Sequence, residues 1–172
     1  MQSASTRLHK GHRGFSLLEM MLATVILLVG VVAIAQLVPA SILMNYRNRT
    51  DSSALVFAQR ELDQFLDQPL ISTSFTDALG NSCNLGNPTT PNSTQGAPLL
   101  GTQPLIDFNQ ATVSGFSFSY LEPSGVTYDV RWDIIITGNG ASVSAKRFIL
   151  SVRQQGGNGY FQPVTLDTMV ER

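Results

Sequence analysis

The stretch RGFSLLE, residues 13–19, decides how this sequence is read, because a long apolar run follows it. From Phe15 to Met44 the only ionisable side chain is Glu19. About thirty residues of helix, at about 1.5 Å each, are more than enough to cross a hydrocarbon core of about 30 Å. The sequence therefore predicts a transmembrane helix over residues 15–44, preceded by a short basic segment.

The carboxylate of Glu19, near the start of that helix, needs an explanation. On insertion scales an acid within a bilayer costs on the order of 2.5 to 3.5 kcal/mol, so it is a candidate functional group whose partner has to be identified. An amine is the obvious partner for a carboxylate. Glu19 is therefore the first candidate site residue of this chain.

Two simpler interpretations of the segment stay open. A secretory signal peptide would use Arg7, Lys10 and Arg13 as its basic region and residues 33–35 (AIA) as its cleavage site, although its apolar region would run well past the usual 7 to 15 residues. An ordinary single-span anchor would keep Glu19 near the membrane interface. The helix dipole favours an acid there by a few tenths to about 1 kcal/mol.

The hexapeptide GFSLLE, residues 14–19, between a basic leader and an apolar helix, resembles the class III leader of type IV prepilins and type II secretion pseudopilins. The resemblance implies that a prepilin peptidase cuts after Gly14 and methylates the new amino terminus at Phe15. It also implies that Glu19 is the self-assembly glutamate, which meets the Phe15 ammonium of a neighbouring subunit.

The same resemblance implies a function and a location. The chain would be a structural subunit of a type IV pilus or a type II secretion pseudopilus. It would cross the inner membrane once, N-terminus inside, before it joins other pilin or pseudopilin subunits in a periplasmic or cell-surface filament. Two other functions stay open on the residues alone: a non-polymerising, single-span membrane-anchored binding module, and a secreted adhesin domain with an ordinary signal peptide.

Composition and charge argue against nucleic-acid binding and enzymatic activity. Removal of the leader, residues 1–14, would leave eight basic against twelve acidic side chains, a balance of −4, so a nonspecific grip on nucleic acid is not expected. Both histidines, His9 and His12, lie in that leader, and Cys83 has no base partner in the sequence. We therefore predict no catalytic residues, no metal site and no cofactor.

Beyond the membrane span, residues 45–68 are predicted to form an amphipathic helix. Its apolar stripe includes Leu55, Ala58, Leu62 and Phe65, and we expect its charged residues on the surface: Arg60, Glu61, Asp63 and Asp67. Pro69 should end the helix, because proline disfavours a helical residue before it. Pro39 removes one helical hydrogen bond, so a kink or an unwound turn is predicted there.

Residues 69–114 read as a variable loop region. No charged side chain occurs from Ala78 to Ile106, and Asn, Thr, Ser, Gly and Pro dominate. A loop of this length tends to be functional or disordered, so a subunit-contact or ligand-facing role is one interpretation and a plain solvated loop is the other. The lone Cys83 excludes an intramolecular disulfide and could be exposed, bridged to another chain or buried.

Residues 115–172 are predicted to form an antiparallel sheet. Alternating apolar residues indicate strands over 116–120, 126–136, 143–153 and 160–166, with a hairpin at Gly138-Asn139-Gly140. The polar side chains of Asp129, Arg131 and Asp133 should form a solvated face. The fold class is therefore α+β, a long N-terminal helix packed on a C-terminal antiparallel sheet. The segments YDVRW and KRFILSV, residues 128–132 and 146–152, also resemble minor pilins and I-type minor pseudopilins.

Overall fold

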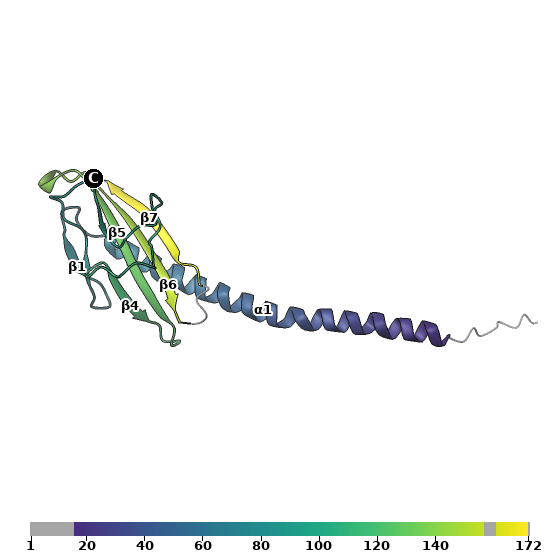
Figure 1. Cartoon of the computed structure of the whole chain (residues 1–172). Coiled ribbons are helices and arrows are strands. Elements are labelled where there is room, and N and C mark those ends of the chain that lie inside the picture. Colours follow the sequence, from purple (N-terminus) through teal and green to yellow (C-terminus); the bar gives the residue numbers. More distant parts are fainter. Residues whose placement is uncertain (1–15, 157–160, 172) are drawn as a thin grey trace, which may run out of the picture. The chain divides into compact units, whose positions relative to one another are not determined.

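The computed structural model describes residues 16–156 and 161–171 (Figure 1). It contains a long helix, a short 3-10 helix and seven strands, with these bounds: α1 (Leu17–Leu66), β1 (Ser74–Thr76), β2 (Ser82–Asn84), β3 (Thr94–Gly96), β4 (Ser117–Leu121), β5 (Thr127–Thr137), η1 (Gly140–Ser142), β6 (Ala145–Gln155) and β7 (Val164–Glu171). The chain divides into two units at Asn45 and Tyr46, within α1.

The first unit contains the start of α1. Helical structure continues through Pro39, so the unwound turn predicted there is not seen. Proline nevertheless has no N–H to donate to the Ala35 carbonyl, four residues earlier. Nearby, the Ser41 hydroxyl donates to the Leu37 carbonyl at 2.9 Å. Pro39 thus lies in a continuous stretch of helix that lacks one hydrogen bond.

The second unit is built on a sheet with strand order β3-β5-β6-β7, and β4 also pairs with β5. All these pairings are antiparallel, and β5 pairs with β6 along its whole length, from Thr127 opposite Gln155 to Thr137 opposite Ala145. The predicted hairpin is present. Gly138 there has a φ of 103°, and a side chain at that position would overlap the backbone of Ser142.

The last strand differs from its prediction. The sequence pattern placed it over residues 160–166, whereas β7 is Val164–Glu171. Pro163 explains the late start, because proline cannot donate a hydrogen bond to the ladder and is tolerated in a sheet mainly at strand ends and edges. The strand therefore begins just after the proline and continues to the end of the described chain.

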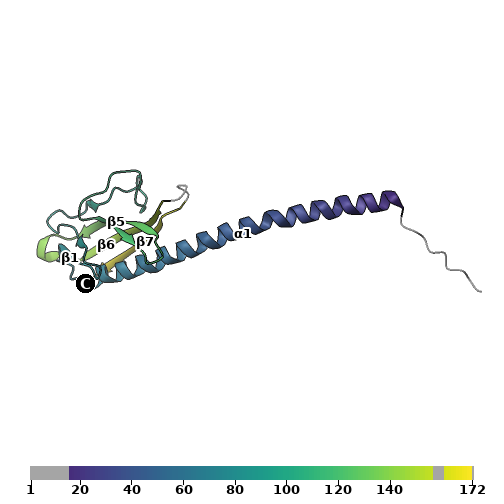
Figure 2. The same cartoon turned by 90° about the horizontal axis from the view of Figure 1, so that it is seen from below.

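The end of α1 packs on one face of this sheet (Figure 2), which confirms the predicted α+β fold. Phe65 is central to the contact. Its ring makes edge-on contacts with Trp132 at 5.2 Å and Phe148 at 5.9 Å between centroids. Aromatic pairs of this kind contribute about 0.5–1.5 kcal/mol beyond their buried area. The helix is thus fixed to the two central strands, β5 and β6.

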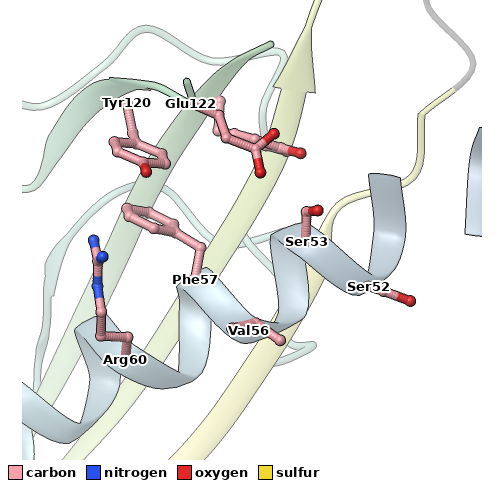
Figure 3. A pocket seen from close by; sticks show the side chains of 8 residues that line it. Ser52, Ser53, Val56, Phe57, Arg60, Tyr120 and Glu122 are labelled. Atoms are coloured by element: carbon pink, nitrogen blue, oxygen red, sulfur yellow. The ribbon is translucent and has the colours of Figure 1, made fainter. Parts of the chain in front are cut away.

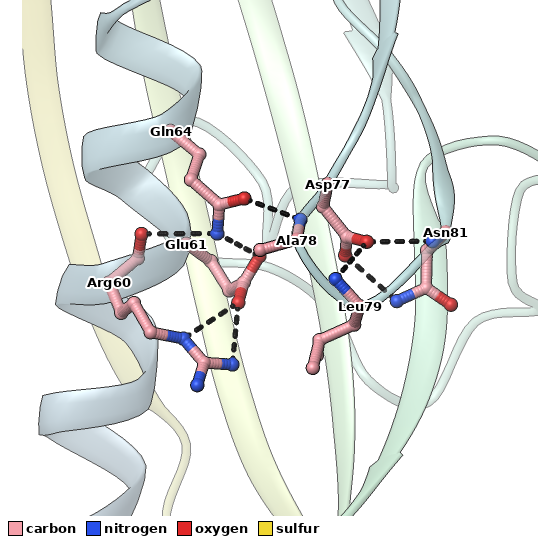
Figure 4. A network of polar contacts seen from close by, with 7 residues as sticks. All are labelled: Arg60, Glu61, Gln64, Asp77, Ala78, Leu79 and Asn81. Carbon is pink, nitrogen blue, oxygen red and sulfur yellow. Dashed lines mark hydrogen bonds and ion pairs between the residues drawn. The ribbon is translucent and has the colours of Figure 1, made fainter.

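The buried face of α1 is not quite the predicted one. Leu55 is 38% exposed, and Phe57 is buried in its place. Glu61, expected on the surface, is fully buried. Its carboxylate accepts hydrogen bonds from Arg60, at 2.9 Å, and from the Gln64 amide, at 3.0 Å (Figure 4). A buried acid with two such donors keeps its hydrogen bonds, although burial still raises the pKa of Glu61.

The predicted loop region contains three short strands. β1 and β2 form a hairpin whose turn is organised by Asp77, which accepts hydrogen bonds from the backbone N–H groups of Leu79 and Asn81 (Figure 4). Gln64 of α1 accepts a hydrogen bond from the Ala78 N–H, which ties the hairpin to the helix. Strands this short carry too little period-2 pattern to be read from sequence.

Cys83 lies in β2 and is buried. Desolvation raises the pKa of its thiol to about 12, with smaller contributions from Asp77 and Glu61. A thiol reacts through its thiolate, so this cysteine is inert near neutral pH. Of the three environments left open for it, the buried one is observed.

The second face of the sheet is covered, so the prediction of a solvated polar face was wrong. Asp129, Arg131 and Asp133 are only 5%, 6% and 1% exposed. Residues 97–110 lie over them, and Phe108 of this segment contacts the guanidinium groups of Arg131 and Arg153 at 4.9 and 4.4 Å.

The side chains beneath this cover differ in how well they are paired. Arg131 donates to Asp129 at 2.8 Å and to the Gln110 carbonyl, also at 2.8 Å. Neither carboxyl oxygen of Asp133 has a hydrogen-bond partner within residues 16–156 and 161–171. Burial raises the pKa of Asp133 to about 7. This side chain is therefore a neutral acid in an apolar cluster until the pH approaches neutrality.

Asp133 generates a pH prediction. Its pKa is higher in the folded chain than the ordinary 3.8 expected after unfolding. Below about pH 4, Asp133 therefore makes its full contribution to the free energy of unfolding. This contribution is lost as pH rises toward 7, at up to about 1 kcal/mol per pH unit. Asp133→Asn should remove this dependence. Urea unfolding of the full chain, followed by the fluorescence of its single tryptophan, should show the variant gaining stability relative to wild type between pH 5 and pH 8. A constant difference would contradict the assignment.

Pro39 generates a second prediction. Because the Ala35 carbonyl lacks its usual donor, amides of residues 35–42 should exchange with solvent deuterium faster than those of the flanking turns of α1 in detergent micelles. Pro39→Ala should restore uniform protection. Equal exchange in wild type and variant would show that the proline does not weaken the helix.

Candidate processing and assembly site

Ser16 begins the described part of the candidate site and caps α1. Its hydroxyl accepts a hydrogen bond from the Glu19 N–H at 3.1 Å, and its carbonyl accepts one from the Met20 N–H, also at 3.1 Å. Serine followed three residues later by glutamate is a typical sequence at a helix start. Glu19 is thus held in the first turn, where the helix dipole favours an acid.

That local role does not account for Glu19 in an apolar segment. The dipole contributes typically 0.3–1 kcal/mol, whereas an acid inside a membrane costs on the order of 2.5 to 3.5 kcal/mol. Among residues 16–156 and 161–171, no cationic group forms an ion pair with Glu19. The predicted cleavage and methylation residues, Gly14 and Phe15, lie outside the described residues.

Residues 17–44 expose an almost entirely apolar surface. Every residue of this span is exposed, including large side chains such as Leu18, Ile26 and Leu37. Two of its hydroxyls are satisfied within the helix: Thr24 donates to the Met21 carbonyl at 2.8 Å and Ser41 to the Leu37 carbonyl at 2.9 Å. α1 is the one helix in the described chain long and apolar enough to cross a membrane. Such a surface requires lipid or other apolar helices around it.

The second unit has a cavity lined in part by aromatic side chains. Its described residues contain no group of three or more His, Cys, Asp or Glu side chains that could hold a metal ion. The cavity in Figure 3, of about 330 Å³, is lined in part by Phe57 and Tyr120, whose rings stack at 4.1 Å between centroids. Arg60 lies over the Phe57 ring at 4.9 Å. This stack packs α1 against β4, and the sequence pattern missed it because it followed Leu55 rather than Phe57.

Comparison with known proteins identifies the start of the chain. Residues 9–35 match the family model described as the prokaryotic N-terminal methylation motif. No curated protein and no solved structure matches the chain. The matched residues include the predicted cleavage junction, Glu19 and much of the exposed apolar helix. The motif implies processing by a prepilin peptidase, and it is typical of structural rather than enzymatic proteins. The chain therefore carries a prokaryotic N-terminal methylation motif in front of an α+β fold in which the end of α1 packs on an antiparallel sheet.

Proposed function

We propose that this protein is a structural subunit of a type IV pilus or type II secretion pseudopilus, cleaved after Gly14, methylated at Phe15 and assembled through residues 15–44. One observation carries the proposal: the methylation motif coincides with an exposed apolar helix that has a single acid in its first turn. The strand pattern of β5 and β6 favours a minor pilin or an I-type minor pseudopilin within this family.

Assembly accounts for the apolar surface of α1. Burial of a Leu, Ile or Val side chain is favourable by about 1.5–3 kcal/mol, so a helix with this surface stays in lipid or packs against similar helices. The leader motif and the apolar helix together indicate inner-membrane anchoring before assembly. Removal of the basic leader at Gly14 would leave the apolar segment on the mature chain, which could then pass from lipid into a bundle of equivalent helices.

Assembly also accounts for Glu19. A new amino terminus at Phe15 would give each subunit one cation at the same end of the helix as the acid. Within one subunit, the Ser16 cap orients the first turn, and the carboxylate remains unpaired among the described residues. An ion pair buried between subunits adds little net stability, but leaving one partner unpaired costs about 3–5 kcal/mol. The pair would therefore select the register in which neighbouring helices meet.

The test compares two substitutions in the first turn of α1. Glu19→Leu should insert into the membrane and be cleaved as well as wild type, yet be absent from sheared filaments, because no carboxylate remains to pair with Phe15. Ser16→Ala is the matched control. It removes the cap, at a cost of about 1 kcal/mol, but keeps the acid, so it should enter filaments. Immunoblots of sheared and membrane fractions give the result.

Either of two outcomes would contradict the proposed role of Glu19. Recovery of Glu19→Leu in sheared filaments at wild-type yield would make the carboxylate incidental. Equal loss of Ser16→Ala and Glu19→Leu from filaments would indicate that the helix cap, rather than an intersubunit ion pair, is what assembly requires.

A further inference from the structure

A second site is found where the β1–β2 hairpin meets the main sheet. The cleft there has a volume of about 530 Å³, within the roughly 300–1,000 Å³ of small-molecule sites. We call it the amide cleft. Its lining comes from β1, β2, β3 and the segments beside them: Thr73, Ser74, Asn84, Gly86, Asn87, Gln95 and Phe116.

The lining of the amide cleft carries no charge. Its polar side chains are two hydroxyls and three carboxamides, and its one large apolar group is the half-buried ring of Phe116. The surrounding chain is also neutral, since residues 78–106 contain no charged side chain. A charged ligand would find no counter-charge among these lining residues, whereas carboxamides and hydroxyls both donate and accept hydrogen bonds.

One wall of the cleft is fixed by Gln95. Its carboxamide nitrogen donates to the carbonyls of Asn87 at 3.1 Å and Thr90 at 2.7 Å, and its oxygen accepts a hydrogen bond from the Asn87 N–H. Gly86, at φ 76°, lies directly against this side chain, and a Cβ there would come within 3.3 Å of the Gln95 oxygen. The wall is therefore formed before any ligand binds.

Asn84 presents an available carboxamide to the cleft. Its backbone N–H donates to the Gly115 carbonyl at 2.8 Å, and its carbonyl accepts from the indole N–H of the buried Trp132 at 2.9 Å. Its side-chain amide makes no hydrogen bond to another residue in the described part of the chain, and Gly115 packs against that amide. Because its backbone is fixed and its side-chain amide has no partner, Asn84 is well placed to form hydrogen bonds with a ligand.

We propose that the amide cleft binds a neutral carbohydrate. The hydroxyls of a sugar ring match carboxamide and hydroxyl partners, and its C–H face can lie on the Phe116 ring. An added peptide strand fits less well, because several backbone groups bordering the cleft already have partners: the Thr73 carbonyl with the Leu85 N–H, and both polar backbone groups of Asn84 and Asn87. This inference is independent of filament assembly.

Binding can be measured on the full chain in a phosphocholine detergent, since glycoside detergents would compete. The probes are free glucose, galactose, mannose and N-acetylglucosamine, with triglycine as the peptide probe and glucuronate as the charged one. Saturation-transfer NMR should detect at least one neutral sugar. Asn84→Asp, which replaces the amide by a carboxylate of the same shape, should lower the affinity for that sugar by at least about tenfold.

Asn109→Asp introduces the same change at an exposed position outside the cleft and should bind like wild type. Phe116→Leu should weaken sugar binding while far-ultraviolet circular dichroism reports a folded chain, since the Phe116 ring lies too near Trp132, at 6.2 Å between centroids, for fluorescence to report folding. Binding of none of the four sugars, equal binding by Asn84→Asp and wild type, or a preference for triglycine or glucuronate would each overturn the proposal. Filament incorporation of Asn84→Asp should be normal, so failure of sugar binding leaves the proposed assembly role untouched.

Discussion

The apolar surface of residues 17–44 is the constraint on which the account depends. Within the described chain nothing covers it, so the segment needs surroundings as apolar as itself. Lipid and a bundle of similar helices are the two such environments that a cell offers. A single acid in the first turn distinguishes them, because an acid is costly in lipid and tolerable when an amine meets it.

In the second unit, different elements cover the two faces of the sheet. One face is covered by the end of α1, through the aromatic contacts of Phe65 with Trp132 and Phe148. The other is covered by residues 97–110, which enclose the paired Asp129 and Arg131 and the unpaired Asp133. Burial of the sheet therefore requires both a helix and a loop. The loop covers the face that contains the unpaired carboxylate of Asp133.

Long, strongly periodic features could be predicted from the sequence, and local exceptions could not. The apolar span, the helix ending near Pro69 and the central hairpin between β5 and β6 all follow from periodicity and turn residues. The burial of Glu61 and Asp133 could not be foreseen, because period alone does not reveal that a distant loop covers a polar face. The amide cleft was equally hidden, since three strands of three residues each build it. Only a general ligand-facing role for that region was open from its composition.

The most direct test of the account is the mass of the mature amino terminus. Filaments sheared from cells that carry the native assembly machinery should yield a first peptide that begins with N-methylated Phe15. Gly14→Val cells should retain the uncleaved precursor in the membrane. A mature chain beginning at Gln36 would identify a signal peptide, and an intact chain beginning at Met1 would identify a simple anchor. Either result would contradict processing and assembly through the class III leader.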